Sequence, residues 1–186
     1  MFPKALHPAP LPPADLPQVV RRRFVLAATI AACSPWSARA EVLPEPQGAV
    51  VLKLGGKIRR TNRGDEAFFD MAMLESLPQR TFTTKTPWYA QPRKFTGPLL
   101  RDLLQRVGAQ GQTMRVSALN DYRIDIPFDD VMRFDVVLAR LLDDQPMTVR
   151  EKGPLFMIYP FDSNPLLRNA VYYSRSVWQL KAIDLL

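Results

Sequence analysis

The clearest helix in this sequence begins within the stretch Phe95-Thr-Gly-Pro-Leu-Leu-Arg-Asp-Leu-Leu104. Pro98 has the fixed backbone angle that suits the first turn of a helix, and the leucines after it recur with helical spacing on one face. Gly108 then ends the pattern. The stretch therefore predicts a helix over residues 98–107 with one apolar face.

Short apolar segments of the kind typical of strands surround this helix. The predicted elements are a hairpin over 49–54 and 57–60, a helix over 67–77, strands over 79–84, 114–119, 122–127, 155–159 and 176–186, a polar loop over 85–94, and a helix or strand over 134–141. Strands mixed with so few helices indicate an α+β fold with mixed sheets in a single domain. No glycine-rich turn joins a strand to a helix, which argues against the folds that bind dinucleotides and nucleoside triphosphates.

The N-terminal part of the chain has the plan of a secretory signal. A basic run at Arg21–Arg23 precedes the apolar segment Phe24–Cys33, and small residues end this part at Ala40. We therefore predict a signal peptide over residues 1–40 and a mature domain over residues 41–186, in a protein that is periplasmic or otherwise exported.

Three other interpretations of the same segment stay open. The basic run and the residues after it resemble a twin-arginine signal. Ile30-Ala-Ala-Cys33 resembles a lipobox, in which case the protein would be lipid-anchored through Cys33. The segment could also form a buried N-terminal helix. We favour cleavage after Ala40.

Removing residues 1–40 changes both the charge and the available chemistry. The chain has 25 Lys and Arg and 18 Asp and Glu, and residues 1–40 hold five of the former and one of the latter, so the domain has a net charge of +3. This small excess, without any zinc finger or RNA-binding motif, argues against nucleic acid as a partner. The only histidine and the only cysteine are His7 and Cys33. The domain therefore has no Cys/His zinc ligands, disulfides, thiol or Ser–His nucleophiles, or imidazole acid–base groups.

Two segments combine polar and aromatic residues in a way that suits a planar ligand. Trp88 and Tyr89 lie in the predicted polar loop, where their rings could stack on a ligand or fold back onto the domain. The corner Asn120-Asp121-Tyr122 offers an amide and a carboxylate, which can match the donors and acceptors on the edge of a pterin or purine. A plain hairpin turn would also explain this corner.

A third candidate cluster lies toward the C-terminus. Lys152 and Arg175 could hold an anion, and Tyr159 lies in the predicted strand that follows Lys152. Trp178 adds aromatic surface, although it could equally be a core residue of the last strand.

Two aspartate pairs, at 129–130 and 143–144, have the residue type of a metal site. Such pairs occur more often in turns and at helix starts, where they need no ion. We predict this structural role for both pairs and no metal site.

Four motifs follow one another in the order found in a known family. They are Phe95–Leu104, Ala118–Tyr122 with Ile126-Pro127, Lys152–Pro160 and Ser174–Ile183. Together they resemble the oxidoreductase molybdopterin-binding domain, which is the fold of the sulfite oxidase family. The resemblance extends over residues 48–186, and the chain is most similar to the short secreted bacterial members.

The chain departs from the enzymes of this family at two places. In those enzymes a cysteine thiolate binds molybdenum within the segment that resembles Phe82–Trp88, and this chain has threonines and a lysine there. Hydroxyl and ammonium groups are poor substitutes for a soft thiolate. The enzymes also often have Lys-Trp-Leu near the end, where this chain has Trp178-Gln179-Leu180. The resemblance therefore predicts a pterin or molybdopterin-like ligand without molybdenum.

Some short secreted members of this fold bind pterin and work with membrane-bound cyclic-di-GMP enzymes. The resemblance therefore predicts a periplasmic pterin-binding protein without redox catalysis, whose partner is the periplasmic domain of such an enzyme. We expect Trp88 with Tyr122 or Trp178 to stack the ring, Asn120 and Asp121 to pair with its edge, and Lys152 and Arg175 to line the mouth. The full predicted ligand-binding set is Trp88, Tyr89, Asn120, Asp121, Tyr122, Lys152, Tyr159, Arg175 and Trp178.

Two other functions remain open. One is a molybdopterin-dependent oxidoreductase that holds its metal without a thiolate, which a twin-arginine signal would favour. The other is a scaffold or partner subunit that has kept the fold without the pocket. A scaffold predicts that Trp88, Asn120, Asp121 and Tyr122 do not converge on one cavity.

Overall fold

The computed structural model describes residues 43–186, so the predicted signal peptide and the lipobox at Cys33 lie outside the described residues. The α-helices of this part are α1 (Met71–Glu75), α2 (Leu100–Arg106), α3 (Phe128–Arg133) and α4 (Ala170–Arg175). Short 3-10 helices cover Val149–Glu151 and Pro165–Leu167. No helix within residues 43–186 is long and apolar enough to cross a bilayer.

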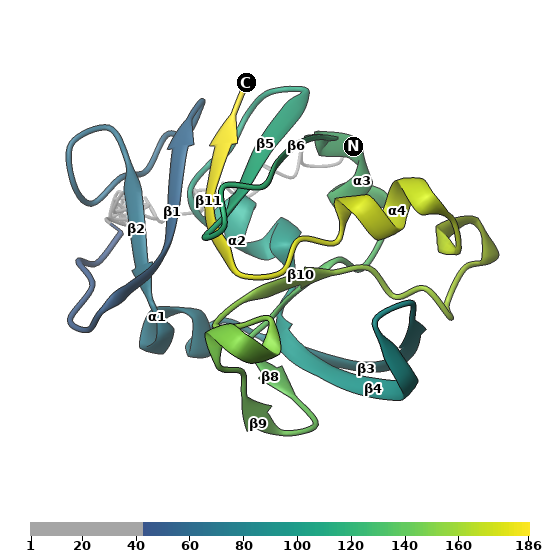
Figure 1. Cartoon of the computed structure of the whole chain (residues 1–186). Helices are drawn as coiled ribbons and strands as arrows, with labels where there is room; N and C mark the ends of the chain where they lie inside the picture. Colours follow the sequence, from purple (N-terminus) through teal and green to yellow (C-terminus); the bar gives the residue numbers. More distant parts are fainter. Residues whose placement is uncertain (1–42) are drawn as a thin grey trace, which may run out of the picture. The chain divides into compact units, whose positions relative to one another are not determined.

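The largest sheet has five strands in the order β2-β1-β11-β5-β6 (Figure 1). Its strands are β1 (Val50–Gly56), β2 (Ala67–Asp70), β5 (Thr113–Ala118), β6 (Arg123–Pro127) and β11 (Leu180–Leu185). β1 and β11 pair in parallel, and every other pair in this sheet is antiparallel. The C-terminal strand therefore lies at the centre of the sheet.

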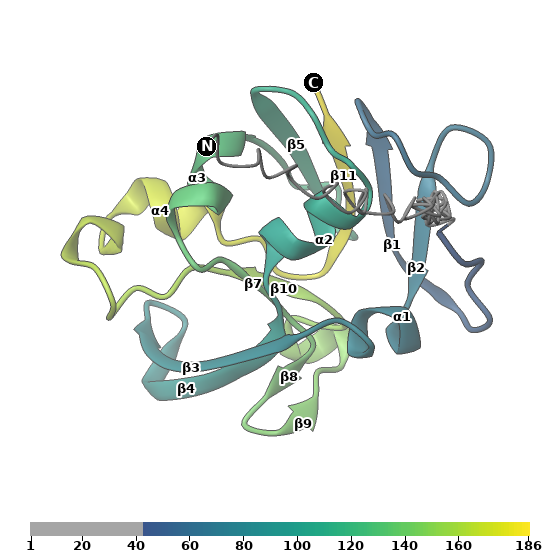
Figure 2. The same ribbon diagram turned by 180° about the vertical axis from the view of Figure 1, so that it is seen from behind.

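Helix α2 covers one face of this sheet, as the view from behind shows (Figure 2). Leu100, Leu103 and Leu104 are fully buried, which confirms the predicted helix and its apolar face. The helix begins at Leu100 and not at Pro98, because Leu99 has an extended backbone and Pro98 still belongs to the preceding strand.

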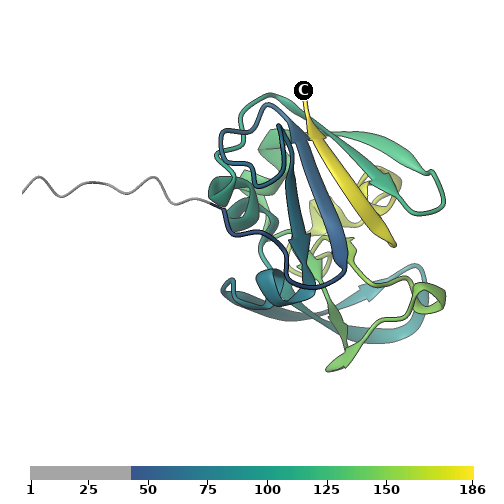
Figure 3. The ribbon, with the colours of Figure 1, turned by 90° about the vertical axis from the view of Figure 1, so that its left-hand side faces the viewer.

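Six further strands form two smaller sheets below the five-stranded one (Figure 3). They are β3 (Gln79–Thr86), β4 (Tyr89–Pro98), β8 (Leu141–Leu142) and β9 (Gln145–Pro146) in one sheet, and β7 (Val137–Ala139) with β10 (Phe156–Ile158) in the other. The polar loop predicted over 85–94 is wrong, because β3 and β4 stay paired as a hairpin up to Thr86 and Tyr89. Backbone hydrogen bonds hold these strands together although most side chains of β3 are exposed.

The remaining differences from the predicted elements have local causes. The hairpin over 49–54 and 57–60 is wrong, since Gly56 brings the chain against the backbone of Leu185 and β1 pairs with β2 and β11. The helix predicted over 67–77 begins only at Met71, because Asp70 is still extended and caps the helix through a 2.9 Å bond from the Met73 N–H. The final strand begins at Leu180 and not at 176.

The fold class is nevertheless as predicted, an α+β single domain with mixed sheets and few helices. Asp129 and Asp130 lie in the first turn of α3, and Asp143 and Asp144 form a turn with left-handed backbone angles, so both pairs have the predicted structural places. Residues 43–186 contain no group of three or more acidic, His or Cys side chains arranged to hold a metal ion.

Candidate functional site

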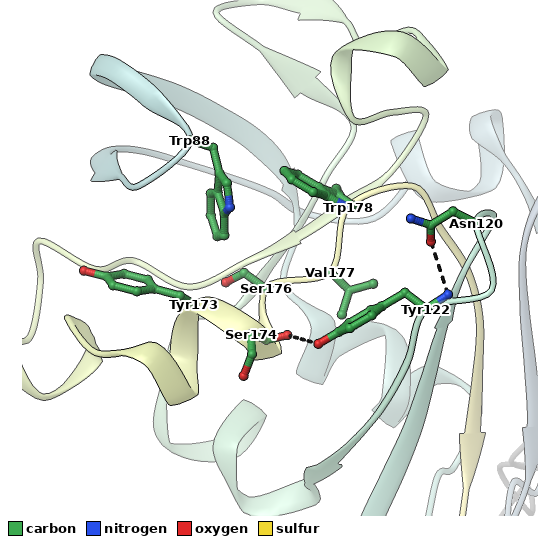
Figure 4. A pocket seen from close by; sticks show the side chains of 8 residues that line it. All are labelled: Trp88, Asn120, Tyr122, Tyr173, Ser174, Ser176, Val177 and Trp178. Carbon is green, nitrogen blue, oxygen red and sulfur yellow. Dashed lines mark hydrogen bonds between the residues drawn. The ribbon is translucent and has the colours of Figure 1, made fainter.

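An aromatic hollow of about 270 Å³ lies where three separate parts of the chain meet (Figure 4). Its walls come from the β3–β4 turn, the β5–β6 turn, and helix α4 with the segment that leads into β11. The lining residues are Trp88, Asn120, Tyr122, Tyr173, Ser174, Ser176, Val177 and Trp178. A hollow of this size is near the lower end of the range for small-ligand sites, about 300–1,000 Å³.

Trp88 forms one wall from the tip of the β3–β4 hairpin. Pro87 and Trp88 are the only residues between the paired positions Thr86 and Tyr89, so the turn is tight and its aromatic residue projects from a rigid hairpin. The indole ring lies 5.7 Å from that of Trp178, measured between ring centroids. These contacts hold Trp88 in place before any ligand arrives.

Further rings surround Trp88 on its inner side. Its centroid lies 5.6 Å from the buried ring of Phe156 and 6.2 Å from that of Phe161. Tyr173 of α4 approaches at 6.3 Å, edge to face. Such tilted and edge-on geometries are favourable for aromatic pairs, so the cluster is a packed platform and not a loose collection of rings.

The β5–β6 turn supplies the opposite wall. The Asn120 Oδ1 atom accepts the Tyr122 N–H at 3.2 Å, while Asp121 takes a left-handed backbone angle of φ 64° that Asp tolerates better than most residues. Tyr122 then donates its hydroxyl to the Ser174 carbonyl at 3.1 Å. This bond connects the turn to helix α4 across the hollow (Figure 4).

Helix α4 and the residues after it complete the site. Asn169 caps the helix by accepting the Val171 N–H at 2.9 Å. Ser174 donates its hydroxyl to the Val171 carbonyl and Ser176 donates to the Tyr172 carbonyl, at 2.8 and 3.1 Å. The two serine side chains therefore line the hollow with their protons already engaged.

A buried anchor under α4 involves two residues that were predicted to touch the ligand. Arg175 Nη1 and the Tyr159 hydroxyl both donate to Asp130 Oδ2, at 2.7 and 3.0 Å. Burial, together with the neighbouring Asp130 carboxylate, raises the pKa of the fully buried Tyr159 well above its usual value. These three side chains fix α4 onto α3 and do not line the hollow.

Lys152 contacts the ring of Trp178 and thereby supports the hollow without lining it. Its ammonium nitrogen lies 4.6 Å from the Trp178 centroid and 5.0 Å from the Tyr89 centroid, which is within cation–π distance. The Tyr89 hydroxyl is buried without a hydrogen-bond partner among the described residues, and burial raises its pKa. Lys152 therefore contacts two aromatic rings. It does not line the hollow as the predicted anion-binding residue.

The nine predicted ligand-binding residues thus fall into three groups. Trp88, Asn120, Tyr122 and Trp178 converge on the hollow. Lys152 contacts the Trp178 wall, and Tyr89 is connected to that wall through Lys152. Asp121, Tyr159 and Arg175 point elsewhere: the Asp121 side chain is 80% exposed and is bonded to Lys181 at 3.0 Å, which lowers its pKa.

Four lining residues, Tyr173, Ser174, Ser176 and Val177, were absent from the predicted set. They were missed because α4 was not predicted. Asn169 before an Ala-Val-Tyr-Tyr run is a helix-start signal that could have indicated it. The bend between α4 and β11, which brings Ser176 and Trp178 to the same wall, has no comparable signal in the sequence.

A second, more polar hollow of about 320 Å³ shares Tyr173 with the first. It contains Lys85, Thr86 and Arg168, and Arg168 forms a 3.0 Å ion pair with Asp162. Asp162 also accepts the Lys85 backbone N–H at 2.7 Å. The carboxylate in this hollow is therefore occupied by protein donors.

The threonines of β3 determine whether this site can hold molybdenum. Thr84 is almost fully buried, and its hydroxyl oxygen accepts the Asp162 N–H at 3.0 Å. Residues 43–186 contain no cysteine, and the residues that line the hollow have only oxygen and nitrogen as polar atoms. These groups do not fit a thiolate-ligated molybdenum, whereas the aromatic walls fit a pterin ring.

Comparison with known proteins identifies the family of this domain. The family model described as oxidoreductase molybdopterin binding domain matches residues 64–162, more than half of the chain. The match includes Trp88, Asn120 and Tyr122, and it ends before α4. No curated protein matches the chain. The chain belongs to the oxidoreductase molybdopterin-binding domain family.

Proposed function

We propose that this domain binds a small pterin in the aromatic hollow and acts as a binding module without redox catalysis. The observation that carries the proposal is the convergence of Trp88, Asn120 and Tyr122, from two turns far apart in the sequence, on one cavity. A plain hairpin turn at residues 120–122 would not need to face an indole ring across an open space. The convergence also argues against a scaffold that has lost the pocket.

The walls suit a flat heteroaromatic ring. Trp88, Trp178 and Tyr122 supply aromatic rings to these walls, and Tyr122 is held in place through its bond to Ser174. Stacking of a base-like ring on an aromatic side chain contributes about 1–3 kcal/mol. The rings already pack against Phe156 and Phe161, so little conformational entropy is lost on binding.

The absence of redox catalysis is proposed from the chemistry of the side chains. The family's enzymes use a cysteine thiolate on molybdenum, and the corresponding strand here carries Thr83, Thr84, Lys85 and Thr86. The Thr84 hydroxyl is already used to hold the Asp162 backbone. A pterin without a metal needs none of these ligands, so the residues present support a binding role better than an oxidoreductase role.

Export and a membrane partner belong to the same proposal. Residues 1–40 have the order of a secretory signal, and the resemblance to short secreted family members supports a periplasmic ligand sensor for a membrane cyclic-di-GMP enzyme. Cell fractionation of the tagged full chain tests the first part. Recovery from the cytosol with residues 1–40 still attached would overturn it.

The ligand itself is the most direct test of this function. The full chain is expressed in an exporting bacterial host, purified under native conditions and denatured, and the released small molecules are identified by mass spectrometry. The proposal predicts a simple pterin at close to one equivalent, with metal analysis showing no matching molybdenum. A pyranopterin dithiolene with stoichiometric molybdenum would contradict it and would support an oxidoreductase.

A further inference from the structure

Strand β3 is the outer strand of its sheet, with β4 as its one neighbouring strand (Figure 2). In β4, the Lys94 and Thr96 carbonyls accept N–H groups from residues that flank β8, so these two residues direct their backbone groups toward β8. Across the β3–β4 ladder they lie opposite Thr83 and Thr81. Because opposite residues of an antiparallel ladder are either both bonded to each other or both turned outward, the backbone groups of Thr81 and Thr83 point away from β4.

This edge is open over Thr81–Thr83. Both threonines are exposed, and no group within residues 43–186 forms a hydrogen bond with their outward N–H and C=O groups. Two residues farther on, the Lys85 N–H is taken by the Asp162 carboxylate at 2.7 Å, which closes the edge at that end. Residues 81–83 contain no proline and no β-bulge. They therefore offer a short template on which another strand can pair.

A hollow of about 370 Å³ lies on the open side of β3. Arg80 and Phe82 line it from the strand, on the one face that alternate residues share. Arg133 and Phe134, at the end of α3, form a further wall, and the segment 160–164 completes it. That segment is on the open side because it contains the carboxylate that accepts the outward Lys85 N–H. A strand added to β3 would therefore direct alternate side chains toward this hollow.

The charges around the hollow favour an acidic occupant. The carboxylate that lines it among the described residues, Asp135, is held by Arg101 at 2.7 Å. Arg80 lies 3.6 Å from Asp135 and Arg133 lies 3.7 Å from Asp129, and both distances are too long for a hydrogen bond. The two guanidinium groups therefore keep donors that the carboxylates of another chain can accept in pairs.

We propose that the free edge of β3 docks an extended acidic segment of a partner protein, which pairs as an additional strand. Its main chain bonds to Thr81 and Thr83, and its carboxylates reach Arg80 and Arg133. A second copy of β3 would not supply these carboxylates, because it would bring its own arginines to the pairing. The surface shares no lining residue with the aromatic hollow, so the inference goes beyond pterin binding and does not depend on it.

The test uses two capped pentapeptides, one of alternating valine and glutamate and one of alternating valine and lysine. Each is titrated at millimolar concentration into the ¹⁵N-labelled full chain at low salt and followed by NMR. We expect the glutamate peptide to shift the amide signals of Thr81 and Thr83 and to bind about tenfold tighter than the lysine peptide. Equal affinity for the two peptides, or glutamate-peptide shifts confined to other residues, would overturn the proposal.

Thr83→Pro removes one outward N–H and leaves the bonds to β4 in place, because proline is tolerated where an edge N–H faces outward. We expect it to weaken the glutamate peptide by about fivefold or more, whereas the control Thr83→Val keeps the N–H and the affinity. Equal binding by the two folded variants would show that the main chain takes no part.

Arg80→Glu keeps the test decisive if the proline variant does not fold, because this side chain is 59% exposed. We expect the preference to reverse in favour of the lysine peptide. An unchanged preference would contradict the role of the arginines. Dimerisation of the unmodified chain in gel filtration, without binding of the glutamate peptide, would replace the acidic segment by a second copy and overturn the proposal.

Discussion

Two hollows of this domain differ in both size and chemistry, and the smaller one is the more aromatic. The sheet-face hollow, formed on the five-stranded sheet by Lys53, Arg115, Ser117, Arg123, Lys181, Ala182 and Asp184, has a volume of about 530 Å³. The aromatic hollow has about 270 Å³. The larger one contains no aromatic ring, whereas the smaller one is built largely from them.

The hydrogen-bond partners explain why we propose the smaller hollow as the ligand site. On the sheet face, Lys53 pairs with Glu66 and Arg115 with Asp125, at 2.8 and 2.9 Å. In the aromatic hollow, the indole N–H groups and the Asn120 NH₂ group have no hydrogen-bond partner within residues 43–186. Groups left without partners next to stacked rings indicate a ligand more reliably than volume does.

The largest effect is expected on stability, at the buried Asp130 that anchors helix α4 beside the aromatic hollow. Asp130→Ala leaves Arg175 and the buried Tyr159 hydroxyl without their acceptor, so the free energy of unfolding should fall by about 3 kcal/mol. Asp125→Ala is the matched change on the sheet face and should cost much less, because exposed ion pairs contribute little. Chemical denaturation followed by circular dichroism measures both. Equal losses would show that the two regions are supported in the same way.

A smaller effect is expected from the cation that supports Trp178. Lys152→Met keeps the length of the side chain and removes the charge 4.6 Å from the ring, so pterin affinity should fall by about 2- to 20-fold. Lys181→Met is the control on the sheet face, where the same substitution should leave pterin affinity unchanged. Calorimetric titration of pterin into both variants measures the two affinities. A larger loss from Lys181→Met would place the ligand on the sheet.

The smallest effect is expected at Asp121. Its exposed carboxylate is bonded to Lys181 and does not line the hollow, so Asp121→Asn should change pterin affinity by less than about twofold. The predicted pairing of this carboxylate with the ring edge requires a loss of tenfold or more. Titration of this one variant therefore separates the two descriptions of the β5–β6 turn.

Much of the fold was predictable because local signals and tertiary structure agree there. Pro98, the leucine spacing and Gly108 marked α2 to within two residues at its start. Most of β3 was predicted as a strand over 79–84, whereas β4 was hidden because its polar first half lacks the apolar alternation that marks a half-buried strand. Helix α4 was hidden because it is short and has no fully buried residue.

The sequence indicated which residue types form the candidate site. It indicated only some of the residues that line the hollow. Aromatic residues next to turn pairs pointed to Trp88, Asn120 and Tyr122. Charged residues were harder to assign, because the sequence does not show which charge pairs with which. Arg175 is engaged by Asp130, 45 positions away in the sequence, and no spacing rule foretells such a contact.

Replacement of Trp88 tests the central claim most directly. Pterin is titrated by calorimetry into the full chain, into Trp88→Ala, and into Arg115→Ala as the sheet-face control, with folding checked by circular dichroism. Because the pterin loses the indole ring on which it stacks, Trp88→Ala should weaken pterin binding by about 5- to 100-fold. Arg115→Ala should leave pterin binding unchanged. Undiminished pterin affinity in a folded Trp88→Ala variant would contradict the assignment of the aromatic hollow as the ligand site.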